Sequence, residues 1–105
     1  MKTFITILIL GLSTTSFAQV TNIPDPNFEQ ALIDLGIDSD GIVNGQVLTS
    51  DIETVMSLNV ENKGIQDLTG LEDFIALEDL NVSNNLFNSL ILTSNPNLKT
   101  LIVNT

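Results

Sequence analysis

The stretch LEDLNVSNNLFNSL, residues 77–90, decides the fold of this chain. Five of its apolar residues stand at positions 77, 80, 82, 87 and 90, and the same positions are apolar 22 residues earlier, in VMSLNVENKGIQDL at residues 55–68. A third copy begins at Leu98 and continues with Leu101 and Val103, at a spacing of 21 residues. Matched apolar positions at a constant spacing identify an internal repeat.

Each copy of the repeat contains a short strand and a connection to the next strand. Leu58 and Val60, like Leu80 and Val82, alternate with polar residues, which is typical of a strand. A spacing of 22 residues is too long for a hairpin and indicates a crossover to a parallel neighbour, which should be right-handed. Apolar residues recur at every third position from Ile65 to Leu80. This spacing favours 3₁₀ or irregular turns over long helices.

The repeat resembles that of leucine-rich repeat proteins, whose unit is L-x-x-L-x-L-x-x-N-x-L. The resemblance covers residues 55–105 and is clearest in LNVSNNLF, residues 80–87. The 22-residue spacing is similar to the internalin class, and residues 23–51 resemble the helical cap that precedes such repeats in exported bacterial proteins. The resemblance implies an α/β fold: a short leucine-rich repeat solenoid with a parallel β-sheet on its concave face, 3₁₀ or irregular convex turns and a small helical N-terminal cap.

The asparagine of the motif is Asn85 in the second repeat, whereas Lys63 stands at this position in the first. The chain must turn sharply after each strand, which leaves backbone N–H and C=O groups inside the coil. An asparagine amide can donate to and accept from such groups. We therefore expect Asn85 to be a structural residue, the start of an asparagine ladder.

We predict that residues 19–54 form the cap and residues 55–105 the repeats, two complete and a third incomplete. In the cap, Asp25 is a good N-cap with Pro26 at the first helical position, and Gly36 is a natural stop, which predicts a helix over 26–35. The apolar face of this helix has the spacing of one helical side and consists of Phe28, Ala31, Leu32 and Leu35.

The acidic stretch DSDGIVNG, residues 38–45, has some features of a calcium loop. In the EF-hand register, however, Ile42 falls on a ligand position whether the loop starts at Asp38 or at Asp40, and position 12 from Asp40 is Asp51 rather than glutamate. The interpretation favoured by the sequence is a small hairpin flanked by two tight turns, Asp-Gly and Asn-Gly, without a metal.

The N-terminus has the pattern of an export signal. Lys2 precedes the apolar stretch FITILILGL, residues 4–12, and Ser16-x-Ala18 fits the small-residue rule for cleavage after Ala18. Nine residues would reach only ~14 Å as a helix, too short to cross a membrane. We expect residues 1–18 to be a cleavable signal peptide, the mature chain to start at Gln19 without a stable membrane span, and the protein to be secreted or attached to the cell surface.

The composition excludes several classes of function. The chain has no cysteine or histidine, so it has no disulfide, thiolate metal site, imidazole ligand or Ser-His triad. Its net charge of −10 opposes binding to nucleic acids. The paired acids Glu72-Asp73 and Glu78-Asp79 are predicted to lie on the solvated surface rather than to do acid–base chemistry. We expect no enzyme activity and no cofactor.

The remaining candidate is the concave face, through which leucine-rich repeat proteins usually bind partners. The resemblance implies a non-catalytic extracellular interaction module that binds a protein or a glycan through this face. Alternatively, the chain is a structural N-terminal capping segment of a longer exported protein whose function lies in further repeats or domains. The predicted face is polar and acidic, with one apolar member, and comprises Ser57, Asn59, Glu61, Asp79, Asn81, Ser83, Thr100, Ile102 and Asn104.

The number of repeats bears on both alternatives. Repeats of this kind bury their core against their neighbours, and about three or more are needed for stability. The last predicted strand, residues 98–103, would leave an apolar edge uncovered. We expect the chain to be the N-terminal part of a longer protein; a short product that pairs edge to edge is the alternative.

Overall fold

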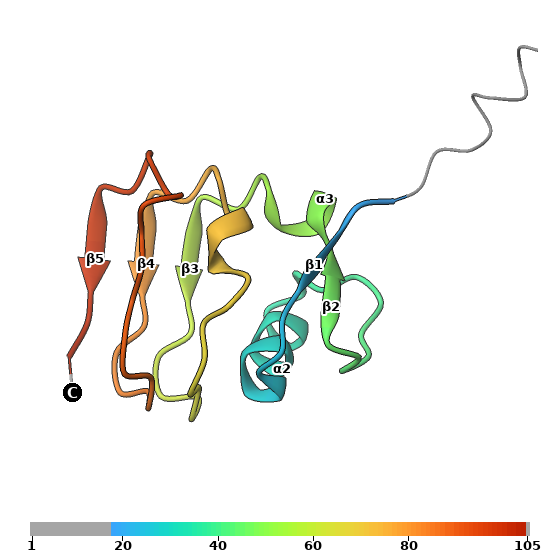
Figure 1. Cartoon of the computed structure of the whole chain (residues 1–105), viewed down its shortest axis with the longest axis horizontal. Helices are drawn as coiled ribbons and strands as arrows, with labels where there is room; N and C mark the ends of the chain where they lie inside the picture. Colours follow the sequence, from blue (N-terminus) through green and yellow to red (C-terminus); the bar gives the residue numbers. More distant parts are fainter. Residues whose placement is uncertain (1–17, 105) are drawn as a thin grey trace, which may run out of the picture.

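The computed structural model describes residues 18–104. It contains a two-stranded antiparallel sheet, β1-β2, and a three-stranded parallel sheet, β3-β4-β5 (Figure 1). The predicted signal peptide, residues 1–18, lies outside the described residues except for Ala18. No helix within residues 18–104 has the length and apolar composition needed to cross a membrane.

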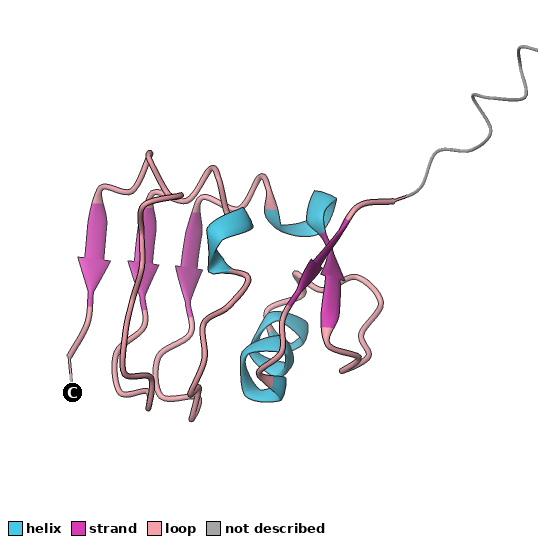
Figure 2. Ribbon diagram, viewed as in Figure 1, coloured by secondary structure: helices cyan, strands magenta, loops and turns pink. Residues whose placement is uncertain are grey.

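The parallel sheet is built from the three copies of the repeat. Its strands are β3 (Ser57–Asn59), β4 (Asp79–Asn81) and β5 (Thr100–Ile102), which lie side by side in Figure 2. The pairing aligns Leu58 with Leu80 and Leu80 with Leu101, the register predicted from the spacing. Leu58 and Leu80 are buried, whereas Leu101 is 42% exposed because no repeat follows β5 within residues 18–104.

The connection from β3 to β4, for which the spacing predicted 3₁₀ or irregular turns, contains the 3₁₀ turn η1 (Leu71–Asp73). Leu71, Phe74 and Leu77 are buried behind the sheet, as their three-residue spacing predicted. The connection from β4 to β5 packs against this turn through Asn95, a buried residue whose Nδ2 donates to the carbonyl oxygens of Leu71 and Phe74, both at 3.1 Å. The sequence did not single out Asn95.

The cap contains the helix α2 (Pro26–Asp34), whose N-cap is Asp25. The helix ends one residue earlier than predicted, with Leu35 as C-cap and Gly36 at a φ of 75°. Leu35 does not belong to the buried face, since it is 49% exposed. The polar residue Glu29 is fully buried instead, beside the three apolar residues Phe28, Ala31 and Leu32.

The prediction of a hairpin within residues 38–45 is wrong. That segment is an irregular loop, and the strand that follows it, β2 (Gln46–Leu48), pairs antiparallel with β1 (Val20–Asn22). The pairing continues beyond the strands, where the Ile23 N–H donates to the Gly45 carbonyl at 2.9 Å. The β2 backbone thus finds its partner in an earlier segment, which a local turn pattern could not reveal. The short helix α3 (Thr49–Ile52) follows β2.

The cap packs directly on the first repeat. The rings of Phe28 and Phe74 stack with centroids 6.3 Å apart, and both side chains are fully buried. The Thr21 hydroxyl donates to the Asp73 carboxylate at 2.7 Å, and the Asn27 amide donates to the Gly64 carbonyl at 3.0 Å. Cap and first repeat therefore share one hydrophobic core.

Candidate binding face

The outward side chains of the parallel sheet form a shallow face, called here the strand face. Because side chains alternate along a strand, the first and third residues of each strand point away from the core. Their pairing places Ser57, Asp79 and Thr100 in one row and Asn59, Asn81 and Ile102 in another. All six line one hollow of ≈ 190 Å³.

Three further predicted face residues lie beyond the carboxyl ends of the strands. Glu61 and Asn104 are exposed, but Ser83 is only 3% exposed, so its assignment to the solvent-facing set is wrong. The Ser83 hydroxyl accepts a hydrogen bond of 2.9 Å from the Asn104 N–H. Strand β4 ends at Asn81, and the in-and-out alternation continues to the buried Val82 but breaks at Ser83, which is buried as well.

Hydrogen bonds hold two face side chains in place. The Asn81 amide donates to Glu61 Oε1 at 2.6 Å, which connects the second repeat to the first. Asn81 Oδ1 accepts from the Ser83 N–H at 3.0 Å, and Asn59 Oδ1 accepts from the Glu61 N–H at 3.1 Å. These contacts limit the motion of the amide groups and leave a polar face with fixed hydrogen-bonding groups.

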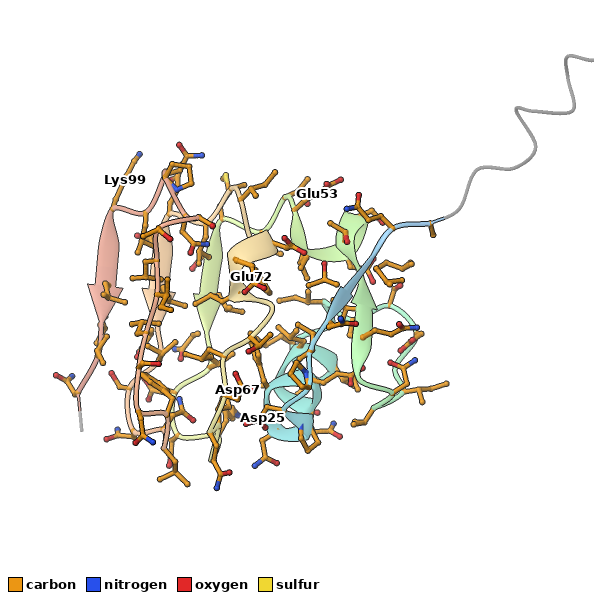
Figure 3. The ribbon with its side chains drawn as sticks, viewed as in Figure 1. Asp25, Glu53, Asp67, Glu72 and Lys99 are labelled. Carbon is orange, nitrogen blue, oxygen red and sulfur yellow. The ribbon has the colours of Figure 1, made fainter. Side chains whose placement is uncertain are left out.

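The strand face is acidic and has one exposed apolar side chain. Its carboxylates are Glu61 and Asp79, and Ile102 is 42% exposed. Lys99 lies at the other end of the strands (Figure 3), where its Nζ is 3.7 Å from the Glu78 carboxylate. Both partners are solvent-exposed, so this ion pair contributes little to stability. A ligand of the strand face would meet hydrogen-bonding groups and negative charge.

Asn85 lies next to the turn of the first repeat and not on the strand face. Its Oδ1 accepts from the N–H groups of Lys63 and Ile65, each at 3.0 Å. Its Nδ2 lies within hydrogen-bonding distance of three carbonyl oxygens, those of Val60, Val82 and Ser83, at 2.8, 3.1 and 3.3 Å. One amide thus joins the backbones of two successive repeats after their strands.

A second polar cluster, in the cap, was not predicted as a site. One carboxylate oxygen from each of Glu29, Asp38 and Asp40 lies within 4.8 Å of the others. Burial, and then contact with the carboxyl groups of Glu29 and Asp40, raises the pKa of Asp38 to about 7. The sequence singled out Asp38 and Asp40 as acids of a contiguous loop, but Glu29 belongs to the preceding helix. The only feature of the sequence that could have indicated a buried Glu29 is its position beside Phe28, next to the buried face of the helix.

The arrangement of cap and sheet is that of an internalin-like leucine-rich repeat segment. The chain is similar to an internalin, InlF, of Listeria monocytogenes, with a TM-score of 0.67 and 21% identity over 79% of this chain and 25% of that one. It is also similar to the functional domain of InlJ from the same species, which includes a cysteine ladder, with a TM-score of 0.64 and 23% identity over 83% of this chain and 21% of that one.

A third similar structure comes from another genus. It contains the CBM51-2 and INT domains of Clostridium perfringens ZmpB, with a TM-score of 0.65 and 28% identity over 90% of this chain and 20% of that one. The present chain therefore spans a quarter or less of the length of these structures. No protein-family model and no curated protein matches the sequence.

Proposed function

We propose that this chain is a non-catalytic extracellular interaction module, which binds a protein or a glycan through the strand face. The observation that carries the proposal is the alignment of six outward side chains from three parallel strands in one hollow. The internalin-like fold supports it, because in this architecture the repeats stack into a solenoid with an extended concave surface. In this proposal each further repeat would add another row to that surface.

The chemistry of the strand face limits the kinds of partner that it can bind. Amides and carboxylates held by hydrogen bonds suit a polar ligand, such as a glycan or a basic protein surface. The face contains none of the tryptophan, tyrosine or arginine residues that dominate protein hot spots. We therefore expect weak binding by these repeats alone.

A second proposed function is structural. The cap closes the first repeat through stacked rings and several side-chain hydrogen bonds, which is what the terminal unit of a repeat array requires. In this alternative the chain shields the core, and the binding residues belong to additional repeats or domains of a longer protein.

Both alternatives place the protein outside the cell, secreted or on its surface. The proposed export signal supports this location, and cleavage after Ala18 would leave Gln19 as the first residue. Intact-mass measurement of the protein recovered from the medium or envelope of an expressing bacterium tests the assignment. A retained Met1–Ala18 segment in that fraction would overturn it.

Binding assays with matched variants distinguish the two functions. The purified chain is applied to a glycan array and to an array of extracellular proteins, together with Asp79→Lys on the strand face and Glu53→Lys in the cap. Both acids are exposed, so both variants change the surface charge equally. If the ligand binds through the strand face, the Asp79→Lys variant should bind a ligand of the wild type at least tenfold more weakly. The Glu53→Lys variant should bind it with the wild-type affinity.

The structural alternative predicts a different pattern. Neither array would retain the wild-type chain, and deletion of these residues from a longer protein would lower its melting temperature without changing its ligand affinity. Equal loss of affinity in both charge variants would show non-specific electrostatics and would count against the strand face.

A further inference from the structure

The cap contains a buried acidic cluster that the proposed binding function does not use. Glu29 comes from helix α2, whereas Asp38 and Asp40 come from the irregular loop that follows it. Glu29 is fully buried and Asp38 is 5% exposed, which is unusual for carboxyl groups without a basic partner. The two lysines within residues 18–104, Lys63 and Lys99, both belong to the repeats.

Two oxygens of this cluster have no hydrogen-bond partner. They are Glu29 Oε2 and Asp38 Oδ2, both inaccessible to solvent. A buried carboxylate oxygen without a partner is costly, and carboxylates as close together as those of this cluster also repel one another. The cluster therefore needs a positive species between its oxygens.

The distances fit one metal ion. Calcium binds carboxylate oxygens at about 2.3–2.6 Å, so two oxygens on one ion can lie at most about 5.2 Å apart. The three carboxylate oxygens of the cluster lie within 4.8 Å of one another. Oxygen ligands in an irregular arrangement suit calcium better than magnesium, which requires a near-ideal octahedron.

Three other oxygens of the cluster are held in place by hydrogen bonds. Glu29 Oε1 accepts from the N–H groups of Asn44 and Gly45, at 3.0 and 2.7 Å. Asp40 Oδ1 accepts from the Ile42 N–H at 2.9 Å, and its Oδ2 accepts from the Asn44 amide at 2.9 Å. These bonds orient the carboxylates and are the kind of outer contact that supports metal ligands.

We propose that Glu29, Asp38 and Asp40 form a calcium site that fastens the loop of residues 38–45 to helix α2. The EF-hand pattern does not describe this site, because Glu29 lies nine residues before the loop. The competing occupant is a proton shared between Glu29 and Asp38, which would also relieve the repulsion.

Calcium titration of the purified chain tests the proposal. The protein is stripped with chelator and studied near neutral pH by isothermal titration calorimetry and thermal unfolding. The proposal predicts one calcium per chain and a melting temperature that rises with calcium concentration, since a ligand that binds the folded state stabilises it. Magnesium and sodium chloride at equal ionic strength should produce a much smaller shift.

Three variants locate the ion. Glu29→Gln and Asp38→Asn should each lower calcium affinity by at least about tenfold. Asp40→Asn should do the same, and because Asp40 is exposed this variant keeps the core intact. Asp34→Asn, an exposed acid of the same helix outside the cluster, should retain the full calcium response.

The opposing results are equally specific. If calcium leaves the wild type unchanged and Asp38→Asn raises the melting temperature in chelator, the cluster holds a proton and the proposal fails. An equal shift with magnesium or with sodium chloride would show screening of an acidic chain and would also overturn it. Full calcium binding by Asp40→Asn would remove that residue from the site.

Discussion

The Gln66 N–H donates a 2.7 Å hydrogen bond to Asp25 Oδ2, which ties the cap to the first repeat. The same oxygen accepts from the Asp67 N–H at 2.9 Å, and Asp25 and Asp67 lie close together in Figure 3. The other oxygen, Oδ1, caps helix α2 by accepting from the Asn27 N–H at 2.8 Å. One carboxylate therefore serves two elements that are 41 residues apart in the sequence.

Replacement of Asp25 by alanine should destabilise the chain by about 2–4 kcal/mol, because it removes a helix cap and leaves two backbone N–H groups of the first repeat without partners. Urea unfolding measures this loss. The Asp25→Asn variant should lose less stability, since the one side-chain oxygen of asparagine can still cap the helix. Equal stability of Asp25→Ala and wild type would contradict the bridging role.

The stability contributed by Asp25 should depend on pH. Burial by itself raises the pKa of Asp25, but four backbone N–H donors outweigh it and hold the pKa below its ordinary value of 3.8. Because the folded-state pKa is the lower one, the contribution is present above pH 3.8 and is lost as the pH falls through the folded-state pKa.

Urea unfolding of wild type and Asp25→Asn between pH 2 and 6 checks this sign. The stability difference between the two should be constant above about pH 5 and should shrink below about pH 4. Taking the difference cancels the titration of the other carboxyl groups. A difference that grows on acidification would mean that the pKa of Asp25 is raised.

Asn85→Ala should cost about 1–3 kcal/mol, because it leaves backbone groups of two repeats without partners. Thermal unfolding, compared with Asn88→Ala as an exposed asparagine of the same connection, measures the effect. An unchanged melting curve for Asn85→Ala would show that its amide is dispensable.

Gly70→Ala should destabilise the contact between cap and repeat. Gly70 has a φ of 108°, and a Cβ there would lie 2.7 Å from the Asn22 carbonyl oxygen and clash with the Ile23 side chain. We expect a loss of roughly 1–3 kcal/mol from backbone strain alone, and more from the clash.

Gly36→Ala is the matched control for this effect. Gly36 has a φ of 75°, and a Cβ there would meet no atom within 4 Å. The excess loss in Gly70→Ala over Gly36→Ala, measured by chemical unfolding, therefore reports the close approach of cap and repeat. Equal losses in the two variants would argue against tight packing at Gly70.

Most of the repeat region could be predicted from the sequence. A strand at one copy of the repeat implies a strand at the next, so the spacing alone aligned Leu58 with Leu80 and Leu101. The three-residue spacing of apolar residues likewise predicted 3₁₀ or irregular turns in this connection, where the structure has the 3₁₀ turn Leu71–Asp73. The strand face followed from the same alternation, except at Ser83, which is buried and bonds the Asn104 backbone.

The sequence by itself thus determined the repeat, its register and the outward side chains, because these depend on local spacing repeated along the chain. Only the tertiary structure decided the pairing of β1 with β2, the bridge from Asp25 to Gln66 and the meeting of Glu29 with Asp38. Each of these contacts joins segments that do not repeat. These contacts depend on shared burial and on backbone hydrogen bonding across the fold. Neither produces a periodic pattern in the sequence from which the contacts could be predicted.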